Sequence, residues 1–172
     1  LTLVGVAAAA PVTDLAALLT QPAEDPLWGA LLAYSVWSWS QLYGLKQADM
    51  VTPEAEPIVA RAASDCLQTR EQLTRVVADT APLSRLPVTP SDRWRGAMVE
   101  NTPQPWSSGV PVFLAQGARD PVIDPMLTRA FAQRLCFAGI PVRYVSMSRG
   151  DHFTAGVRAA GAAATWITER FA

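Results

Sequence analysis

The order of the elements expected in the last third of the chain constrains the fold more than any other feature. Residues 110–116 and 140–145 are short apolar runs typical of buried strands, and each is followed by a longer segment, 125–137 and 154–171, with the apolar periodicity of a helix. Parallel strands need a crossover connection, which is usually a helix. The order strand, helix, strand, helix therefore predicts an α/β fold with a parallel sheet flanked by helices.

The amino terminus opens with another apolar run, residues 1–9, in which apolar and polar positions do not alternate. This pattern predicts a strand buried on both faces. We therefore expect the chain to begin in the middle of a fold, and no positive residue precedes the run as it would in a signal peptide. The expected organisation is a core built from residues 1–13 and 110–172, with a helical insertion and linker over 14–109.

Capping residues and prolines predict the helices of the insertion. We expect helices at 15–19, 27–43 and 54–80, and a short one at 93–96 inside a proline-rich connection. The stretch 26–45 carries no charge and is long enough to span a bilayer. Its serines, glutamine and tyrosines favour a buried or substrate-facing helix instead.

Composition excludes several classes of protein. Half of the residues are hydrophobic, which excludes disorder, and 14 basic side chains against 15 acidic ones leave a net charge of −1. The sequence has no basic stripe, so nucleic acid is not expected as a partner. One histidine and two cysteines do not supply the usual ligands of a metal site. We expect neither a metal nor an organic cofactor.

Two loops that follow the carboxyl-terminal strands hold candidate chemical groups. Asp120 lies in the loop 117–123 and His152 in the loop 148–153. The helix between them runs back roughly 20 Å, and the next strand returns roughly 20 Å. Both loops therefore lie at the carboxyl ends of neighbouring strands, where α/β sheets place their ligands. We expect Asp120 and His152 to meet.

Such a pair has a specific chemistry. A buried carboxylate accepts the Nδ1–H of an imidazole and fixes its tautomer, which leaves the other nitrogen to take a proton from a hydroxyl nucleophile. Taken singly, Asp120 is an ordinary turn residue before proline and His152 an ordinary loop or capping residue. Their order on consecutive strands favours the functional interpretation. Asp124 is expected to cap the following helix, and Asp151 to face solvent.

Several stretches resemble known families. Residues 117–123, 135–142 and 150–152 resemble the end of an α/β-hydrolase, and residues 3–15 and 100–103 resemble the secretory lipase family of the yeast lipase A type. The resemblance implies a serine hydrolase of carboxylic esters such as lipids and acylglycerols, triacylglycerol included. It implies a secreted or cell-envelope protein.

The same resemblance implies roles for parts of the chain. Asp120 takes the acid role and His152 the base role, while residues 14–95 correspond to a helical cap over the site. The sequence departs from the family pattern because it contains no Gly-x-Ser-x-Gly, the turn that presents the nucleophilic serine. We therefore expect the C-terminal part of an α/β-hydrolase, which supplies Asp and His but not Ser and is inactive alone.

Two sets of residues in the expected cap and body leave alternatives open. One set consists of aromatic residues that either line an acyl or lipid surface or pack the cap on the hydrolase body: Trp28, Tyr34, Trp37 and Trp39. The other set is Cys66 and Cys136, which either form a disulfide between cap and body, as a secreted protein allows, or remain buried free thiols.

A second function belongs to another class. The chain could be a non-catalytic lipid-binding or interaction module. An uncovered strand edge favours association, so such a module would pair with an N-terminal hydrolase fragment, or with itself, through the exposed edge of its sheet.

Overall fold

The protein divides into two compact units, which a computed structural model describes over residues 2–20, 25–86, 88–106 and 109–171. One unit comprises Leu1–Asp14 and Thr102–Ala172, and the other comprises Leu15–Asn101. The helical unit begins one residue after the expected start of the insertion, residue 14, and ends eight residues before its expected end, residue 109. The chain therefore leaves the first unit, builds the second, and returns.

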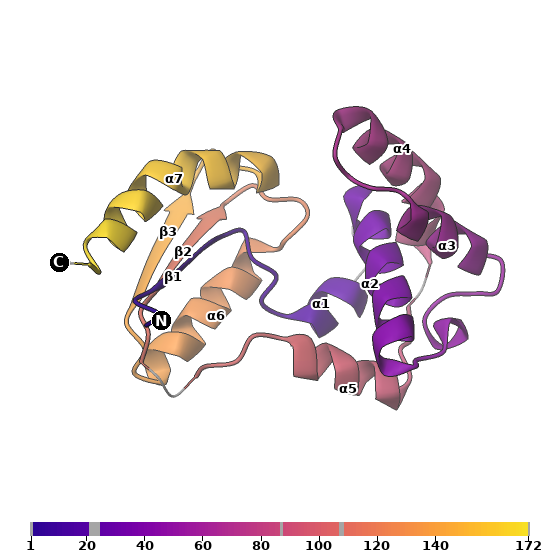
Figure 1. Cartoon of the computed structure of the whole chain (residues 1–172), viewed down its shortest axis with the longest axis horizontal. Helices are drawn as coiled ribbons and strands as arrows, with labels where there is room; N and C mark the ends of the chain where they lie inside the picture. The colour runs from indigo at the N-terminus through magenta and orange to yellow at the C-terminus, as the bar shows by residue number, and fades with distance from the viewer. Residues whose placement is uncertain (1, 21–24, 87, 107–108, 172) are drawn as a thin grey trace. The chain divides into compact units, whose positions relative to one another are not determined.

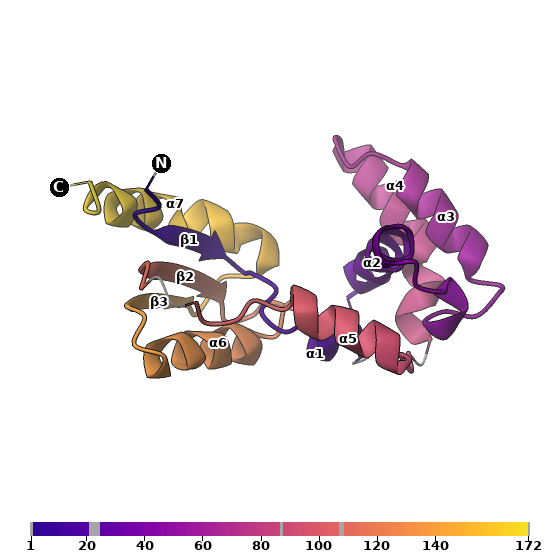
Figure 2. The same cartoon turned by 60° about the horizontal axis from the view of Figure 1, so that its bottom comes forward.

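The first unit is a three-stranded parallel sheet between two helices (Figures 1 and 2). Strands β1 (Val6–Ala9), β2 (Val112–Gly117) and β3 (Val142–Met147) lie in that order. Helix α6 (Pro125–Phe137) covers one face and helix α7 (His152–Thr168) the other. The prediction of an α/β fold with a parallel sheet flanked by helices is confirmed.

Strand β2 is buried along its whole length because it is the central strand and both of its faces are covered. Its side chains alternate between the two helices, as the pleat requires. Val112 and Leu114 belong to the apolar cluster of α6, whereas Phe113 and Ala115 belong to the cluster of α7. The continuous apolar run in the sequence reports this two-sided burial.

Strand β1 differs from its prediction. It covers only Val6–Ala9 rather than residues 1–9, and its side chains alternate between half-buried and exposed. The expectation of burial on both faces was wrong because β1 lies at the edge of the described sheet, where it pairs only with β2.

The second unit is helical. Its helices are α1 (Leu15–Thr20), α2 (Leu27–Tyr43), α3 (Glu56–Ser64), α4 (Arg70–Thr80) and α5 (Asp92–Asn101), with short 3₁₀ turns η1 (Gln47–Asp49) and η2 (Ala81–Arg85). Helix α2 is its centre and packs against α3, α4 and η2. The Asp25 carboxylate accepts the N–H of Leu27 at 2.8 Å at the start of α2, and Gly44 ends it with φ 61°. Glycine adopts this left-handed conformation without steric cost.

The long helix expected over 54–80 is two helices. Thr69 starts α4 with a capping box: its hydroxyl accepts the N–H of Gln72 at 3.2 Å, and the Gln72 side chain accepts the N–H of Thr69 at 2.9 Å. These two hydrogen bonds satisfy backbone N–H groups at the start of a helix. A new helix therefore begins here, and the preceding one ends before it. Helix α5 is also longer than the expected 93–96. No helix in the described part of the chain has the length and apolar character to cross a bilayer.

Candidate active site

The loops after β2 and β3 lie against each other at the carboxyl edge of the sheet. The N–H of Ala118 donates to the carbonyl of Met147 at 2.9 Å, and the N–H of Arg119 donates to the carbonyl of Gly150 at 3.0 Å. Parallel pairing of β2 and β3 puts both loop starts at this edge. Backbone hydrogen bonds therefore fix the separation of the two loops before any side chain is considered.

Gly117 permits this close approach. A Cβ atom added at Gly117 would lie 2.6 Å from the carbonyl oxygen of Gly150 and 2.8 Å from that of Asp151. Both atoms belong to backbone, so neither can rotate away. The glycine is required here by the space between the loops.

Replacing Gly117 with alanine is expected to separate the loops and to destabilise the protein by about 3 kcal/mol, the upper range for overpacking a site that cannot relax. Thermal or urea unfolding measures the loss. The matched control is Gly161→Ala in α7, where an added Cβ meets nothing within 4 Å. That variant should gain up to about 1 kcal/mol from helix propensity. Equal stabilities for the two variants would contradict the contact.

The side chain of Asp120 is fully buried beside these loops. Its Oδ1 accepts the backbone N–H groups of Val122 and Ile123, each at 2.9 Å. Burial alone would raise the pKa of Asp120, but hydrogen bonds from His152, Ile123 and Val122 outweigh it, so this pKa lies below its ordinary value. A buried carboxylate that accepts several N–H donors stays ionised. The loop therefore keeps the ionised carboxylate of Asp120 buried at the carboxyl edge of the sheet.

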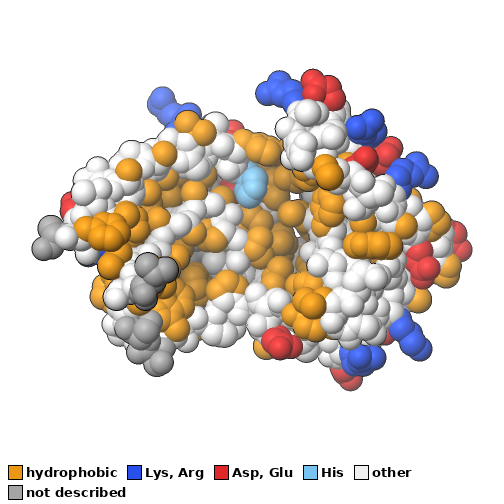
Figure 3. All heavy atoms as spheres, viewed as in Figure 1, with side chains coloured by type: hydrophobic (Ala, Val, Ile, Leu, Met, Phe, Trp, Pro, Cys, Tyr) orange, Lys and Arg blue, Asp and Glu red, His pale blue; other side chains and the backbone are white. Residues whose placement is uncertain are grey.

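His152 lies opposite this carboxylate. Its Nδ1 is 3.0 Å from Asp120 Oδ2, and a quarter of its side chain, 25%, remains exposed. The single histidine is visible at the molecular surface in Figure 3. The sequence-based expectation that Asp120 and His152 meet agrees with this geometry.

Asp151 orients the histidine by starting α7. Its carboxylate accepts the N–H of Thr154 at 2.8 Å, and the Thr154 hydroxyl accepts the N–H of Asp151 at 3.0 Å. These bonds also lower the pKa of Asp151. Asp151 was expected to face solvent, but it is half-buried, and its capping box puts His152 at the first helical position.

The geometry assigns the imidazole tautomer. An ionised carboxylate only accepts hydrogen bonds, so Nδ1 of His152 carries the hydrogen that faces Asp120. In the neutral ring, Nε2 then holds the lone pair that can take a proton. An imidazole fixed in this way can act as a general base and, once protonated, as a general acid.

Sequence analysis missed two further members of this cluster. The Nε2 of Gln116 donates to Asp120 Oδ2 at 2.9 Å, and the hydroxyl of Thr128 donates to Gln116 Oε1 at 2.8 Å. Both side chains are fully buried. A polar residue at the end of an otherwise apolar strand was the available signal for Gln116.

Asp124 and the aromatic candidates differ in their contacts and in their exposure. Asp124 caps α6, as expected, by accepting the N–H of Met126 at 2.8 Å. Trp28 is only 1% exposed and donates to the carbonyl of Leu18, so it is a core residue of the helical unit and lines no surface. Trp37 is exposed, whereas Tyr34 and Trp39 are half-buried.

Cys66 and Cys136 are free thiols and both are exposed. Of the two alternatives, the structure shows free thiols and not the disulfide. The alternative expectation of two buried free thiols was right that the thiols are free and wrong that they are buried.

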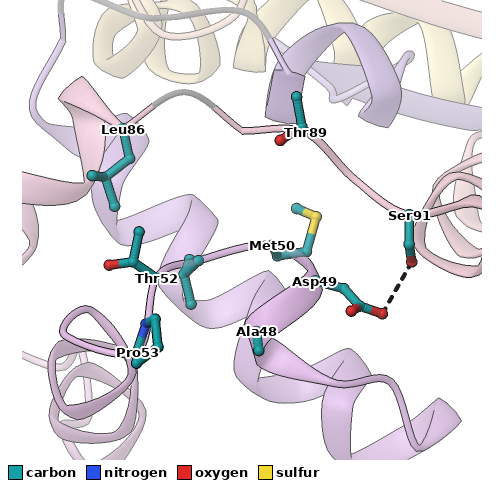
Figure 4. A pocket seen from close by; sticks show the side chains of 9 residues that line it. Ala48, Asp49, Met50, Thr52, Pro53, Leu86, Thr89 and Ser91 are labelled. Atoms are coloured by element: carbon teal, nitrogen blue, oxygen red, sulfur yellow. Dashed lines mark hydrogen bonds between the residues drawn. The ribbon is translucent and has the colours of Figure 1, made fainter.

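The helical unit has a pocket of its own, with a volume of about 420 Å³ (Figure 4). Its lining includes Met50, Leu86 and Asp49, and the Asp49 carboxylate accepts the hydroxyl of Ser91 at 3.2 Å. Asp49 is the only charged group among the lining residues of this pocket, so we assign no chemistry to it. Within the described residues, no group of three or more His, Cys, Asp or Glu could hold a metal ion.

Comparisons with known proteins give a family match for part of the chain and matches to solved structures. Residues 99–172 match the family model of secretory lipases. The X-ray structure of Candida antarctica lipase A in its closed state superimposes with a TM-score of 0.69 at 12% identity, over 98% of this chain and 42% of that chain. A putative non-heme bromoperoxidase, BpoC from Mycobacterium tuberculosis H37Rv, gives a TM-score of 0.37 at 16% identity, over 98% and 57%.

The comparison with the lipase structure shows the fold, which is that of part of an α/β-hydrolase. The chain spans less than half the length of that lipase. No sequence among the curated proteins matches the chain.

Proposed function

We propose that this chain supplies the acid and the base of a Ser-His-Asp hydrolase of carboxylic esters, since residues 99–172 match the family model of secretory lipases. One observation carries the proposal: a fully buried, ionised Asp120 lies 3.0 Å from Nδ1 of a partly exposed His152. The pair sits at the carboxyl edge of a parallel sheet, which is where α/β folds bind their ligands.

The proposed reaction has two halves. Nε2 of His152 takes the proton of a serine hydroxyl while the serine oxygen attacks the ester carbonyl, and the protonated imidazole then donates to the departing alcohol. In the second half, water attacks the acyl-enzyme carbonyl and loses a proton to Nε2, and the protonated imidazole then donates that proton to the departing serine oxygen as the acid is released. Asp120 stabilises the imidazolium in both halves and holds the ring in position.

The serine is proposed to come from a segment outside these residues. The sequence contains no Gly-x-Ser-x-Gly, and the oxyanion hole of an α/β-hydrolase uses the backbone N–H that follows this serine. The chain by itself is therefore proposed to lack the covalent route, and its hydrolysis of esters is expected to be negligible.

The substrate class and the cap are part of the same proposal. A secretory lipase family domain supports lipid esters such as acylglycerols, with triacylglycerol among them, and a secreted or cell-envelope location. We propose that residues 14–109 form a helical cap over the site together with its linker. Within it, Tyr34, Trp37 and Trp39 are the proposed contacts for an acyl chain, because aromatic side chains at a surface offer large apolar area.

Complementation tests this function. The chain is co-expressed with an amino-terminal lipase segment that carries a Gly-x-Ser-x-Gly turn, and hydrolysis of nitrophenyl esters is followed. We expect turnover only when both polypeptides are present, because each supplies part of the triad. The control is the same segment with its serine changed to alanine. Turnover that persists with this control would sink the proposal.

The edge of β1 favours a second candidate. Among the described residues, strand β1 pairs on one side only, and Ala7 and Ala9 are exposed. An open strand edge presents backbone donors and acceptors to another chain. The alternative is thus a non-catalytic lipid-binding or interaction module that pairs with an N-terminal hydrolase fragment or with itself. Fatty-acid binding without turnover in the complementation experiment would support this candidate.

A further inference from the structure

The carboxylate of Asp120 is held from two directions. Its Oδ1 is fixed by the backbone N–H groups of Val122 and Ile123. Its Oδ2 stands between two side chains, His152 Nδ1 at 3.0 Å and Gln116 Nε2 at 2.9 Å. The oxygen that faces the imidazole is therefore the one that Gln116 also contacts.

The amide of Gln116 can take only one orientation. Its Nε2 faces three oxygens: Asp120 Oδ2, the Gly117 carbonyl at 3.3 Å and the Ile123 carbonyl at 3.5 Å. A flipped amide would place its own oxygen against these acceptors. On the other side, the hydroxyl of Thr128 donates to Oε1 at 2.8 Å. Acceptors on one side and a donor on the other thus fix which end of the amide meets the carboxylate.

Packing alone does not require these polar groups. Gln116 follows Val112 and Leu114 on the face of β2 that packs against α6, and Thr128 lies on α6. An apolar side chain would fill the same space without the cost of removing polar atoms from water. A buried amide, in contrast, must find hydrogen-bond partners for its donors and its acceptor. Gln116 finds them in Thr128 and in the carboxylate that faces the imidazole.

We propose that Gln116 and Thr128 are positioning residues that hold Asp120 Oδ2 against His152 Nδ1 and so maintain the imidazole tautomer that leaves Nε2 free of its hydrogen. The inference rests on the proposed ester hydrolysis for its functional meaning. The chain of contacts runs from Thr128 through Gln116 and Asp120 to His152.

The single histidine of the sequence makes this inference measurable without turnover. With ¹⁵N-labelled histidine, the ring nitrogen shifts of the full chain at about pH 9, well above the ordinary imidazole pKa, give the ratio of Nδ1–H to Nε2–H tautomers. We expect Nδ1–H to dominate in the wild type. Gln116→Leu should lower the ratio about tenfold, the size expected for losing a hydrogen bond to a charged group.

Thr128→Val should lower the ratio about threefold, since it removes the hydrogen bond that fixes the Gln116 amide but leaves the amide itself in place. Thr128→Ser keeps the hydroxyl and should stay within about twofold of the wild type. The matched control is Thr80→Val: Thr80 is as fully buried as Thr128, but its hydroxyl donates to the Val76 carbonyl at 2.7 Å within its own helix. This control should lose stability and leave the ratio unchanged.

The outcomes separate the inference from the proposed function. A wild-type ratio in folded Thr128→Val would overturn the positioning role, and this variant decides the matter even if Gln116→Leu does not fold. Predominant Nε2–H in the wild type would overturn it as well. The predicted shift in a protein that shows no esterase activity after complementation would discard the function and leave the positioning role intact.

Discussion

Replacing His152 with alanine is expected to lower kcat of the complemented enzyme about 10⁶-fold, the loss seen when a triad histidine is removed from a serine hydrolase. The serine hydroxyl then has no group to take its proton, and the leaving alcohol has no donor. Hydrolysis of a nitrophenyl ester under saturating substrate measures the effect. The remaining rate comes from binding and the oxyanion hole, which do not depend on the imidazole.

The fold should survive this substitution, because the His152 side chain is partly exposed at the first position of α7 and the helix cap is made by Asp151. Unfolding temperature therefore serves as the control. Added imidazole should restore part of the lost rate, since it can occupy the vacated space and accept the proton. A variant that keeps more than about one-hundredth of the rate would contradict the base role assigned here.

Replacing Asp120 with asparagine is expected to lower kcat about 10⁴-fold in the same assay, by analogy with triad carboxylates elsewhere. The reason lies in the donors around the side chain. The backbone N–H groups of Val122 and Ile123 cannot turn, so the single amide oxygen must face them. The amide NH₂ is then left facing His152, whose Nδ1 must accept and whose Nε2 must carry the hydrogen. The imidazole is held in the wrong tautomer.

Nitrogen shifts of the single histidine check this explanation directly, because Asp120→Asn should invert the tautomer preference of the folded protein. A kcat within about tenfold of the wild type would contradict the role of the carboxylate.

The same variant links the carboxylate to stability. The folded pKa of Asp120 is lowered, since hydrogen bonds from His152, Ile123 and Val122 outweigh the effect of burial. The resulting stabilisation is present above the unfolded pKa of about 3.9 and is lost as the pH falls through the folded pKa. The advantage of the wild type over Asp120→Asn in free energy of unfolding should therefore shrink below about pH 4.

Strands β2 and β3 and the helices that follow them were predictable because their signals are local. The apolar runs that became β2 and β3 are interrupted by a helix that begins at Pro125 behind its Asp124 cap. The direction of a parallel crossover then brings the two following loops together, so Asp120 and His152 could be paired before their distance was known.

The failures have a different origin. Strand β1 looked like a doubly buried strand because its residues are apolar, yet burial depends on which neighbours cover it. The break before α4 depends on a reciprocal bond between Thr69 and Gln72, which the apolar stripe of the surrounding sequence conceals. Trp28 is a core residue because it faces into its own unit, a direction that the uniformly apolar α2 does not reveal.

The sequence by itself determined the order of strands and helices and, through it, the meeting of a carboxylate with an imidazole, because chain direction and element length are local properties. Only the tertiary structure decided that Gln116 lies behind this pair with Thr128 as its partner. Their contact depends on which face of β2 packs on α6, and the choice between two faces of a buried strand is made by packing across the whole sheet.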